Sequence, residues 1–223
     1  MQFFNSIVGR KIIMAVTGFS LLVFVSFHLL GNISFYYGPR GINTYAATLQ
    51  GLGPFIWMFR LLMLTFLSFH VLFGILLTLE NRKAKPEAYA VSRRLRSTFA
   101  GRNMIWTGLI TAFFLIYHLL HFTFYAINPE ISAVRHLDVM GRPDVFIMVV
   151  LGFRDLAVAC VYILALALLA LHLTHGVQSM FQTVGLNNEK AELFLSRAGI
   201  AAAVFLFLGF VSIPISVLAG IMK

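Results

Sequence analysis

Five long apolar runs constrain this chain more than any other feature of its sequence. None of them contains Asp, Glu, Lys or Arg, and they occupy residues 12–37, 61–79, 104–127, 156–182 and 198–222. Each is about as long as the roughly 20 residues that a helix needs to cross a bilayer core. Because the runs are continuously apolar, whereas a barrel strand alternates over about ten residues, they favour helices, which satisfy their own backbone hydrogen bonds in lipid.

We therefore predict an all-α integral membrane protein with a single membrane domain over residues 1–223. Its five transmembrane helices are expected at about 12–37, 55–80, 104–128, 156–182 and 198–222. Composition agrees, since 60% of the residues are hydrophobic and 11% are charged, against about 45–50% and about 25% in soluble domains. The segments 38–54 and 128–155 are expected as loops on one side, and the apolar piece "VFIMVVLGF" in the second is expected to lie along the membrane interface.

The net charge of +9 reports membrane orientation rather than nucleic-acid binding. A nucleic-acid surface interleaves basic residues with exposed aromatics, but most aromatic residues here fall within the apolar runs. Eleven of the 17 basic residues belong to one predicted face: Arg10, Lys11, Arg82, Lys83, Lys85, Arg93, Arg94, Arg96, Arg102, Lys190 and Arg197. The positive-inside rule then places the N-terminus in the cytoplasm and the C-terminus outside.

The cysteine content and the absence of a long polar segment limit the chemistry that the chain can perform alone. Cys160 is the only cysteine, which excludes an intrachain disulfide, an iron-sulfur cluster ligated by this chain and covalent attachment of a c-type haem. The longest polar stretch is 80–103, so no soluble domain is expected. Any redox cofactor would be held by histidine or noncovalently, and water-soluble chemistry would come from another protein.

An internal repeat relates the first predicted helix to the third and the second to the fourth. The first reads "TGFSLLVFVSFH" and the third "TGLITAFFLIYH", with ten residues from glycine to histidine in each. The second and fourth each carry a histidine followed by glycine four residues later. The matched histidines are His28, His118, His70 and His172, and the matched glycines are Gly18, Gly108, Gly74 and Gly176.

Depth along the predicted helices divides the four histidines into two pairs. With a rise of about 1.5 Å per residue, His28 and His118 both lie about 15 Å from the outer face, and His70 and His172 lie about 15 Å from the inner face. Two histidines at equal depth on different helices suit the two axial positions of a haem iron, so we predict two b-type haems.

The four glycines then have a role beside these haems. Gly74 and Gly176 would leave room for a porphyrin edge, and Gly18 and Gly108 would let their helices approach the inner haem. Helix packing alone would also explain each glycine.

Other uses of membrane histidines are possible and leave some residues open. A single histidine can make an interhelical hydrogen bond, and the spacings His118–His121 and His172–His175 resemble zinc or di-iron motifs. Di-iron bundles use inward glutamates, which these helices lack at the relevant depths. His121 and His175 would instead contact a haem propionate or a quinone, or serve packing, and Arg60 would pair with a propionate or extend to the interface.

The ordered set of motifs resembles the membrane cytochrome b subunit of succinate:quinone oxidoreductases, the succinate dehydrogenase and quinol:fumarate reductase family of respiratory complex II. The likeness covers nearly the whole chain and includes the two "TG" pairs, "HLLGN" from His28 and "HLTHGVQSMFQTVG" at the end of the fourth helix. The single-chain, two-haem members of the family have five helices and a cytoplasmic N-terminus. Their axial ligands match His28, His70, His118 and His172, whereas His121 and His175 match no ligand position.

The resemblance implies an electron-transfer role in the cytoplasmic membrane of a prokaryote. A flavoprotein subunit and an iron-sulfur subunit on the cytoplasmic face would interconvert succinate and fumarate, and this chain would exchange electrons with a quinone, menaquinone in particular. The family also forms dimers of heterotrimers. One branch uses a glutamate two residues before the fourth ligand to move protons, but this chain has Ala170 there and no acid in 38–54. Candidate quinone residues by depth are His121, Asn32, Tyr36, Tyr125 and Arg60.

Two other readings remain at this stage. The chain could be the cytochrome b subunit of a hydrogenase, a formate dehydrogenase or a nitrate reductase. A histidine-containing transporter or proton channel is an alternative of a different class. Cytochromes b of the bc type are disfavoured, because no helix here has two histidines more than three residues apart.

Overall fold

The computed structural model describes residues 6–84, 99–183, 185 and 189–223. Its helices are α2 (Ile7–Ile33), η1 (Ser34–Tyr37), α3 (Gly38–Gly51), α4 (Pro54–Lys83), α5 (Phe99–Phe122), η2 (Pro129–Ile131), α6 (Val145–Arg154), α7 (Leu156–Thr183) and α8 (Glu189–Leu218). Five helical segments, which contain α2, α4, α5, α7 and α8, are long and apolar enough to cross a membrane, and the described residues form no strand. The predicted all-helical class with five membrane-length helices is confirmed.

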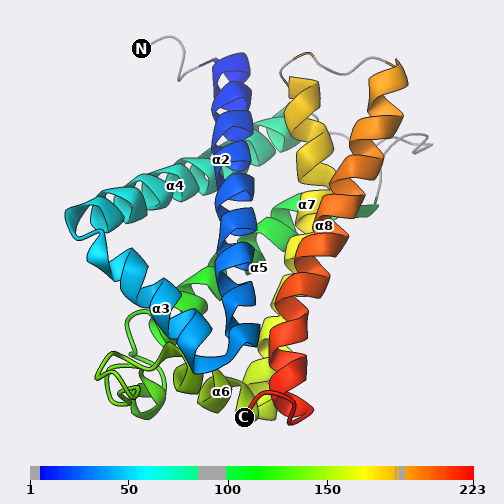
Figure 1. Cartoon of the computed structure of the whole chain (residues 1–223). Coiled ribbons are helices and arrows are strands. Elements are labelled where there is room, and N and C mark those ends of the chain that lie inside the picture. The colour runs from blue at the N-terminus through cyan, green and yellow to red at the C-terminus, as the bar shows by residue number, and fades with distance from the viewer. Residues whose placement is uncertain (1–5, 85–98, 184, 186–188) are drawn as a thin grey trace.

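The long helices pack in two sequence-adjacent pairs joined by a central contact. α2 packs against α4, α5 packs against α7, and α2 also touches α7. α8 lies along α7 in the most extensive contact of the molecule. The start of α2 and the C-terminus lie at opposite ends of the molecule, and α3 and α6 lie at the end with the C-terminus (Figure 1). We call that end the outer end, following the orientation predicted from the basic residues.

Two of the predicted helices are shorter at their outer ends than expected. α2 ends at Ile33 and continues as a 3-10 turn, and α5 ends at Phe122 rather than at 128. After α5 the Ala126 backbone N–H donates to the Leu120 carbonyl at 2.8 Å, around a Tyr125 with a φ of 53°. Such left-handed helix ends usually carry glycine, so a tyrosine there gave no signal in the sequence.

The two segments expected as outer loops contain helices, which corrects the prediction. Residues 38–51 form α3, with Pro39 in its first turn, where a missing backbone N–H costs nothing. The apolar piece "VFIMVVLGF" is part of α6, most of whose residues are buried in the outer end of the molecule, and its position along the membrane interface stays a prediction. α6 packs against α3, α7 and α8. Together α3, α6 and the segment between residues 123 and 144 form a cap, which we call the outer cap.

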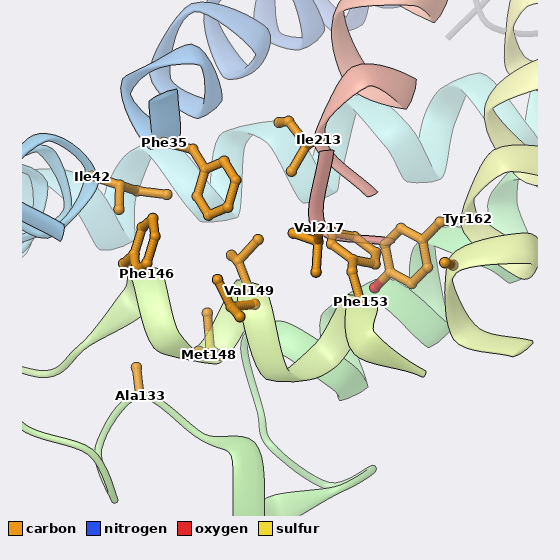
Figure 2. Packing of buried hydrophobic residues seen from close by; sticks show 12 residues of the cluster. Phe35, Ile42, Ala133, Phe146, Met148, Val149, Phe153, Tyr162, Ile213 and Val217 are labelled. Carbon is orange, nitrogen blue, oxygen red and sulfur yellow. The ribbon is translucent and has the colours of Figure 1, made fainter. Parts of the chain in front are cut away.

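The main buried apolar cluster lies under this outer cap and not in the middle of the bundle. Figure 2 shows Phe35 and Phe146 face to face on one side of the cluster and Phe153 and Tyr162 on the other. The Phe35 and Phe146 ring centres are 5.0 Å apart. The full cluster comprises Phe35, Ile42, Ala133, Phe146, Met148, Val149, Val150, Phe153, Ala159, Tyr162, Ile213 and Val217.

A buried asparagine fastens α3 to the start of α6. Asn43 is 1% exposed. Its Nδ2 donates to Asp144 Oδ1 at 3.0 Å, and its Oδ1 accepts the Phe146 backbone N–H at 3.0 Å. Asp144 Oδ1 also accepts the Ile147 N–H at 3.0 Å and so caps α6. Because buried polar groups must be paired, these bonds specify where α3 docks on the cap.

A glycine in the first turns of α3 gives a direct test of how tightly the outer cap is packed. A Cβ at Gly41 would clash with the backbone carbonyl of Ser34, which cannot swing aside as a side chain would. We expect Gly41→Ala to lower the free energy of unfolding by about 1–3 kcal/mol, measured by thermal unfolding in detergent. Gly51→Ala is the matched control on the same helix, since a Cβ there meets nothing within 4 Å. Equal stability of the two variants would contradict this packing.

At the opposite end, an ion pair connects the two helices of the first pair. The Arg10 guanidinium on α2 contacts the Glu80 carboxylate on α4. The most basic part of the sequence, from Lys85 to Arg96, lies outside the described residues. Orientation across the membrane therefore remains a prediction from charge.

Candidate cofactor-binding site

The middle of the bundle contains one large cavity lined by residues from all the long helices. Its volume is about 2290 Å³, more than twice the roughly 1,000 Å³ at the upper end of ordinary small-molecule pockets. The lining includes all four histidines selected by the repeat, which are His28, His70, His118 and His172, and the four matched glycines, Gly18, Gly74, Gly108 and Gly176.

The four histidines form two pairs, each across two helices. The ring centres of His28 and His118 are 6.1 Å apart, and those of His70 and His172 are 6.3 Å apart. The ring planes cross at 82° and 75°. We call His28 and His118 the outer pair and His70 and His172 the inner pair. Within the described residues, no group of three His, Cys, Asp or Glu side chains could hold a metal ion.

The depth argument predicted the observed histidine pairs although the predicted ends of α2 and α5 were wrong. His28 is five residues before the end of α2 and His118 is four residues before the end of α5. Both predicted ends were too long in the same direction, so the error cancelled in the comparison.

Each inner-pair histidine is held by a threonine on the neighbouring helix. His70 Nδ1 is 3.3 Å from Thr17 Oγ1, and His172 Nδ1 is 3.4 Å from Thr107 Oγ1. The Thr17 hydroxyl donates to the Ile13 carbonyl at 2.7 Å, so its oxygen is left to accept from the imidazole. His172 Nδ1 also lies 3.3 Å from the Met104 carbonyl. A carbonyl only accepts, so the proton of His172 is on Nδ1 and the Nε2 lone pair is available to a ligand.

The glycines next to these threonines have a more specific role than the one expected. A Cβ at Gly108 would lie 2.9 Å from His172 Cε1, and a Cβ at Gly18 would lie 3.1 Å from His70 Cε1. Real Cβ atoms rarely come that close to another heavy atom, so both positions need glycine for the imidazole of the adjacent helix to fit. The "TG" pair therefore binds a histidine through its threonine and makes space for it through its glycine.

Two methionines extend the correspondence between the halves, and the sequence analysis missed them. A Cβ at Gly74 would meet Met14 Cε at 3.6 Å, and one at Gly176 would meet Met104 Cε at 3.8 Å. The signal was present, because the sequence reads "MAVTG" before the first histidine and "MIWTG" before the third. The inner pair thus has nearly equivalent surroundings from the two halves of the chain.

The outer pair lacks this equivalence. His118 Nδ1 is 3.4 Å from the Tyr162 hydroxyl, which also lies 3.1 Å from His121 Nδ1. The His28 ring instead packs against Phe24 and Phe210, with ring centres 5.6 and 5.8 Å away. In the described parts of the chain no hydrogen bond reaches that ring. Tyr162 is a site residue that the sequence analysis missed, because a tyrosine ten residues before a histidine fits no motif.

The second histidine of each His-x-x-His spacing lies behind the cavity wall. His121 is fully buried, and its Nε2 has no hydrogen-bond partner among the described residues. His175 packs against Gly101, where a Cβ would lie 3.0 Å from its Cε1. Neither ring lines the cavity.

Of the four remaining quinone and propionate candidates, three line the cavity and one does not. Arg60 and Tyr125 both line the cavity. Burial raises the pKa of Tyr125, and the charge of Arg60 acts in the opposite direction. The Arg60 guanidinium lies 4.9 Å from the centre of the Trp57 ring, a cation–π contact.

Asn32 and Tyr36 differ in whether they reach the cavity. Asn32 lines the cavity, and its Nδ2 donates to the His28 carbonyl at 2.7 Å. Tyr36 does not line the cavity, and its hydroxyl donates to Ser212 Oγ on α8 at 2.7 Å.

Comparison of the chain with protein-family models, with curated proteins and with solved structures found no match in any of the three.

Proposed function

We propose that this chain is a di-haem cytochrome b of the membrane and passes electrons between a quinone pool and soluble redox subunits. The observation that carries this proposal is the pair of facing imidazoles at each of two levels in one cavity. The resemblance in sequence favours succinate dehydrogenase or quinol:fumarate reductase as the enzyme. In that enzyme the flavoprotein and iron-sulfur subunits perform the dicarboxylate chemistry.

The spacing within each pair supports an iron bound from both sides. Two metal–nitrogen bonds of about 2 Å, and roughly 1 Å from each nitrogen to its ring centre, give a separation of about 6 Å. The observed 6.1 and 6.3 Å agree. Zinc or di-iron chemistry would need further ligands at each pair, and among the described residues no third ligand is near.

The residues that line the cavity would have distinct roles in holding the two haems. His28 and His118 would hold the outer haem, and His70 and His172 the inner haem. A bound b-type haem would supply reversible one-electron chemistry. Thr17 and Thr107 keep the inner imidazoles oriented, and the mostly apolar lining of the cavity would favour electron transfer over side reactions.

The proposed quinone site lies beside the outer pair. Arg60, Tyr125 and Asn32 line the cavity there and offer hydrogen bonds to a quinone oxygen or a propionate. Ala170 lines neither this region nor any other part of the cavity, and the matching glutamate of the fumarate-reducing branch is absent. We therefore propose that protons for quinone chemistry come from the outer side and do not cross the membrane through this chain.

An optical spectrum of the purified protein tests the proposal. We expect a reduced b-type α-band and two haems for each chain in an extraction assay. A purified, folded chain without haem would refute the cytochrome assignment. Co-purification of flavin and iron-sulfur subunits, followed by assays of succinate oxidation and fumarate reduction, separates this enzyme from a hydrogenase, formate dehydrogenase or nitrate reductase.

The crossing angles of the imidazole planes predict the electron paramagnetic resonance spectrum of the oxidised protein. At 82° and 75° the two rings of each pair are nearly perpendicular. Perpendicular imidazoles leave two iron d orbitals of π symmetry almost equal in energy, so we expect two low-spin ferric signals with strong g anisotropy. Rhombic signals of small anisotropy, as parallel rings produce, would contradict the observed ring orientations.

A further inference from the structure

The two halves of the chain differ where the outer pair lies. His28 corresponds to His118 with an offset of 90 residues, and the same offset relates Gly31 to His121. His70 corresponds to His172 with an offset of 102, which relates Arg60 to Tyr162. At these two positions the second half carries Tyr162 and His121, and both lie beside His118.

Tyr162 connects the two histidines of the second half. Its hydroxyl lies 3.4 Å from His118 Nδ1 and 3.1 Å from His121 Nδ1. Its ring is held at 5.0 Å from Phe153 and 4.9 Å from Phe114, and the residue is 5% exposed. The hydroxyl is therefore fixed in place by the buried cluster, and it has the two imidazole nitrogens as its only hydrogen-bond partners among the described residues.

The direction of these two hydrogen bonds follows from the chemistry of the groups. A phenol has one proton to donate and an oxygen that accepts. If His118 binds iron through Nε2, its proton is on Nδ1 and is donated to the Tyr162 oxygen. The Tyr162 proton is then donated to His121 Nδ1. His121 consequently carries its own proton on Nε2, the buried nitrogen without a partner among the described residues.

We infer that Tyr162 and His121 are positioning residues that tune the outer haem through His118 alone. This inference rests on the proposed function. A hydrogen bond from Nδ1 makes a ligating imidazole a stronger electron donor, which stabilises oxidised iron. His121 strengthens the effect because it draws the Tyr162 proton and makes the phenol oxygen a better acceptor. His28 has no such support, so the outer haem has one tuned ligand and the inner haem has two that are held alike.

Redox titration of the full-length, haem-loaded protein tests this inference. Tyr162→Phe is expected to raise the midpoint potential of the outer haem by up to a tenfold change in its reduction equilibrium, about 59 mV for one electron. The inner haem should not change. The g anisotropy of the outer signal should change with the potential, because His118 loses the contact that fixes its ring.

Three further variants separate this role from general damage. Thr107→Val should shift only the inner haem, and Tyr117→Phe, which removes a neighbouring hydroxyl that contacts neither ligand, should shift neither. His121→Phe should raise the outer potential less than Tyr162→Phe does. The double variant should match Tyr162→Phe alone, because His121 acts only through Tyr162.

The possible outcomes distinguish the inference from the proposed function. A wild-type chain without haem refutes the proposed function and this inference with it. A di-haem wild type in which Tyr162→Phe leaves the outer potential unchanged, or shifts both haems equally, refutes the inference alone. If Tyr162→Phe does not accumulate, His121→Phe decides, and an unchanged outer potential in that variant also refutes it.

Discussion

His172→Ala is expected to abolish the inner haem while the outer haem remains. The inner pair would lose one of its two axial ligands, and its partner His70 cannot hold the iron from both sides. The outer pair is formed by different residues and is anchored separately by Tyr162. Haem extraction should give about one haem for each chain, and the optical spectrum should lose one α-band component.

His175→Ala is the matched control for this variant. It removes a histidine from the same helix, one turn away, that does not line the cavity. We expect it to retain both haems. Loss of a haem in His175→Ala and not in His172→Ala would refute the pairing, and equal losses in the two variants would favour a His-x-x-His metal site.

Asn43→Leu is expected to give the largest loss of stability in the outer cap. The substitution keeps the branched shape of the side chain but leaves the Phe146 backbone N–H buried without its acceptor and removes a donor from Asp144. An unpaired buried group costs about 1–3 kcal/mol, so we expect the free energy of unfolding to fall by about 2–4 kcal/mol. Thermal unfolding in detergent measures it, and proteolysis between residues 123 and 144 should become faster.

Thr44→Val on the same helix is the control for the Asn43 variant. The Thr44 hydroxyl contacts Arg142 at 3.3 Å on the exposed side of the cap. Water can replace that bond, so the change should cost less than about 0.5 kcal/mol. Equal losses in the two variants would show that Asn43 has no special part in docking α3.

The five membrane-length helices could be predicted because apolar length alone determines them. The pairing of the four histidines could also be predicted, since it depends on residue counts measured from equivalent points on each helix. The ends of α2 and α5 could not, because they are set by local turns such as the one around Tyr125, where no glycine or proline marks the change.

Other features depend on contacts between segments distant in sequence. Polar and glycine-rich residues made 38–54 look like a loop, yet Asn43 and Asp144 dock it as a helix. Tyr162 reaches His118 and His121 only because α7 packs on α5. The "TG" pair was noticed as a repeat, but its contact with the histidine of the next helix could not be deduced from spacing along one helix.

The position of the buried apolar cluster has a consequence for biosynthesis. The cluster joins residues from Phe35 to Val217, so it cannot be completed until nearly the whole chain has emerged from the ribosome. Ten of its twelve residues precede α8, and Ile213 and Val217 on α8 complete it. The outer cap would therefore assemble largely before α8 is made, and α8 would close it last.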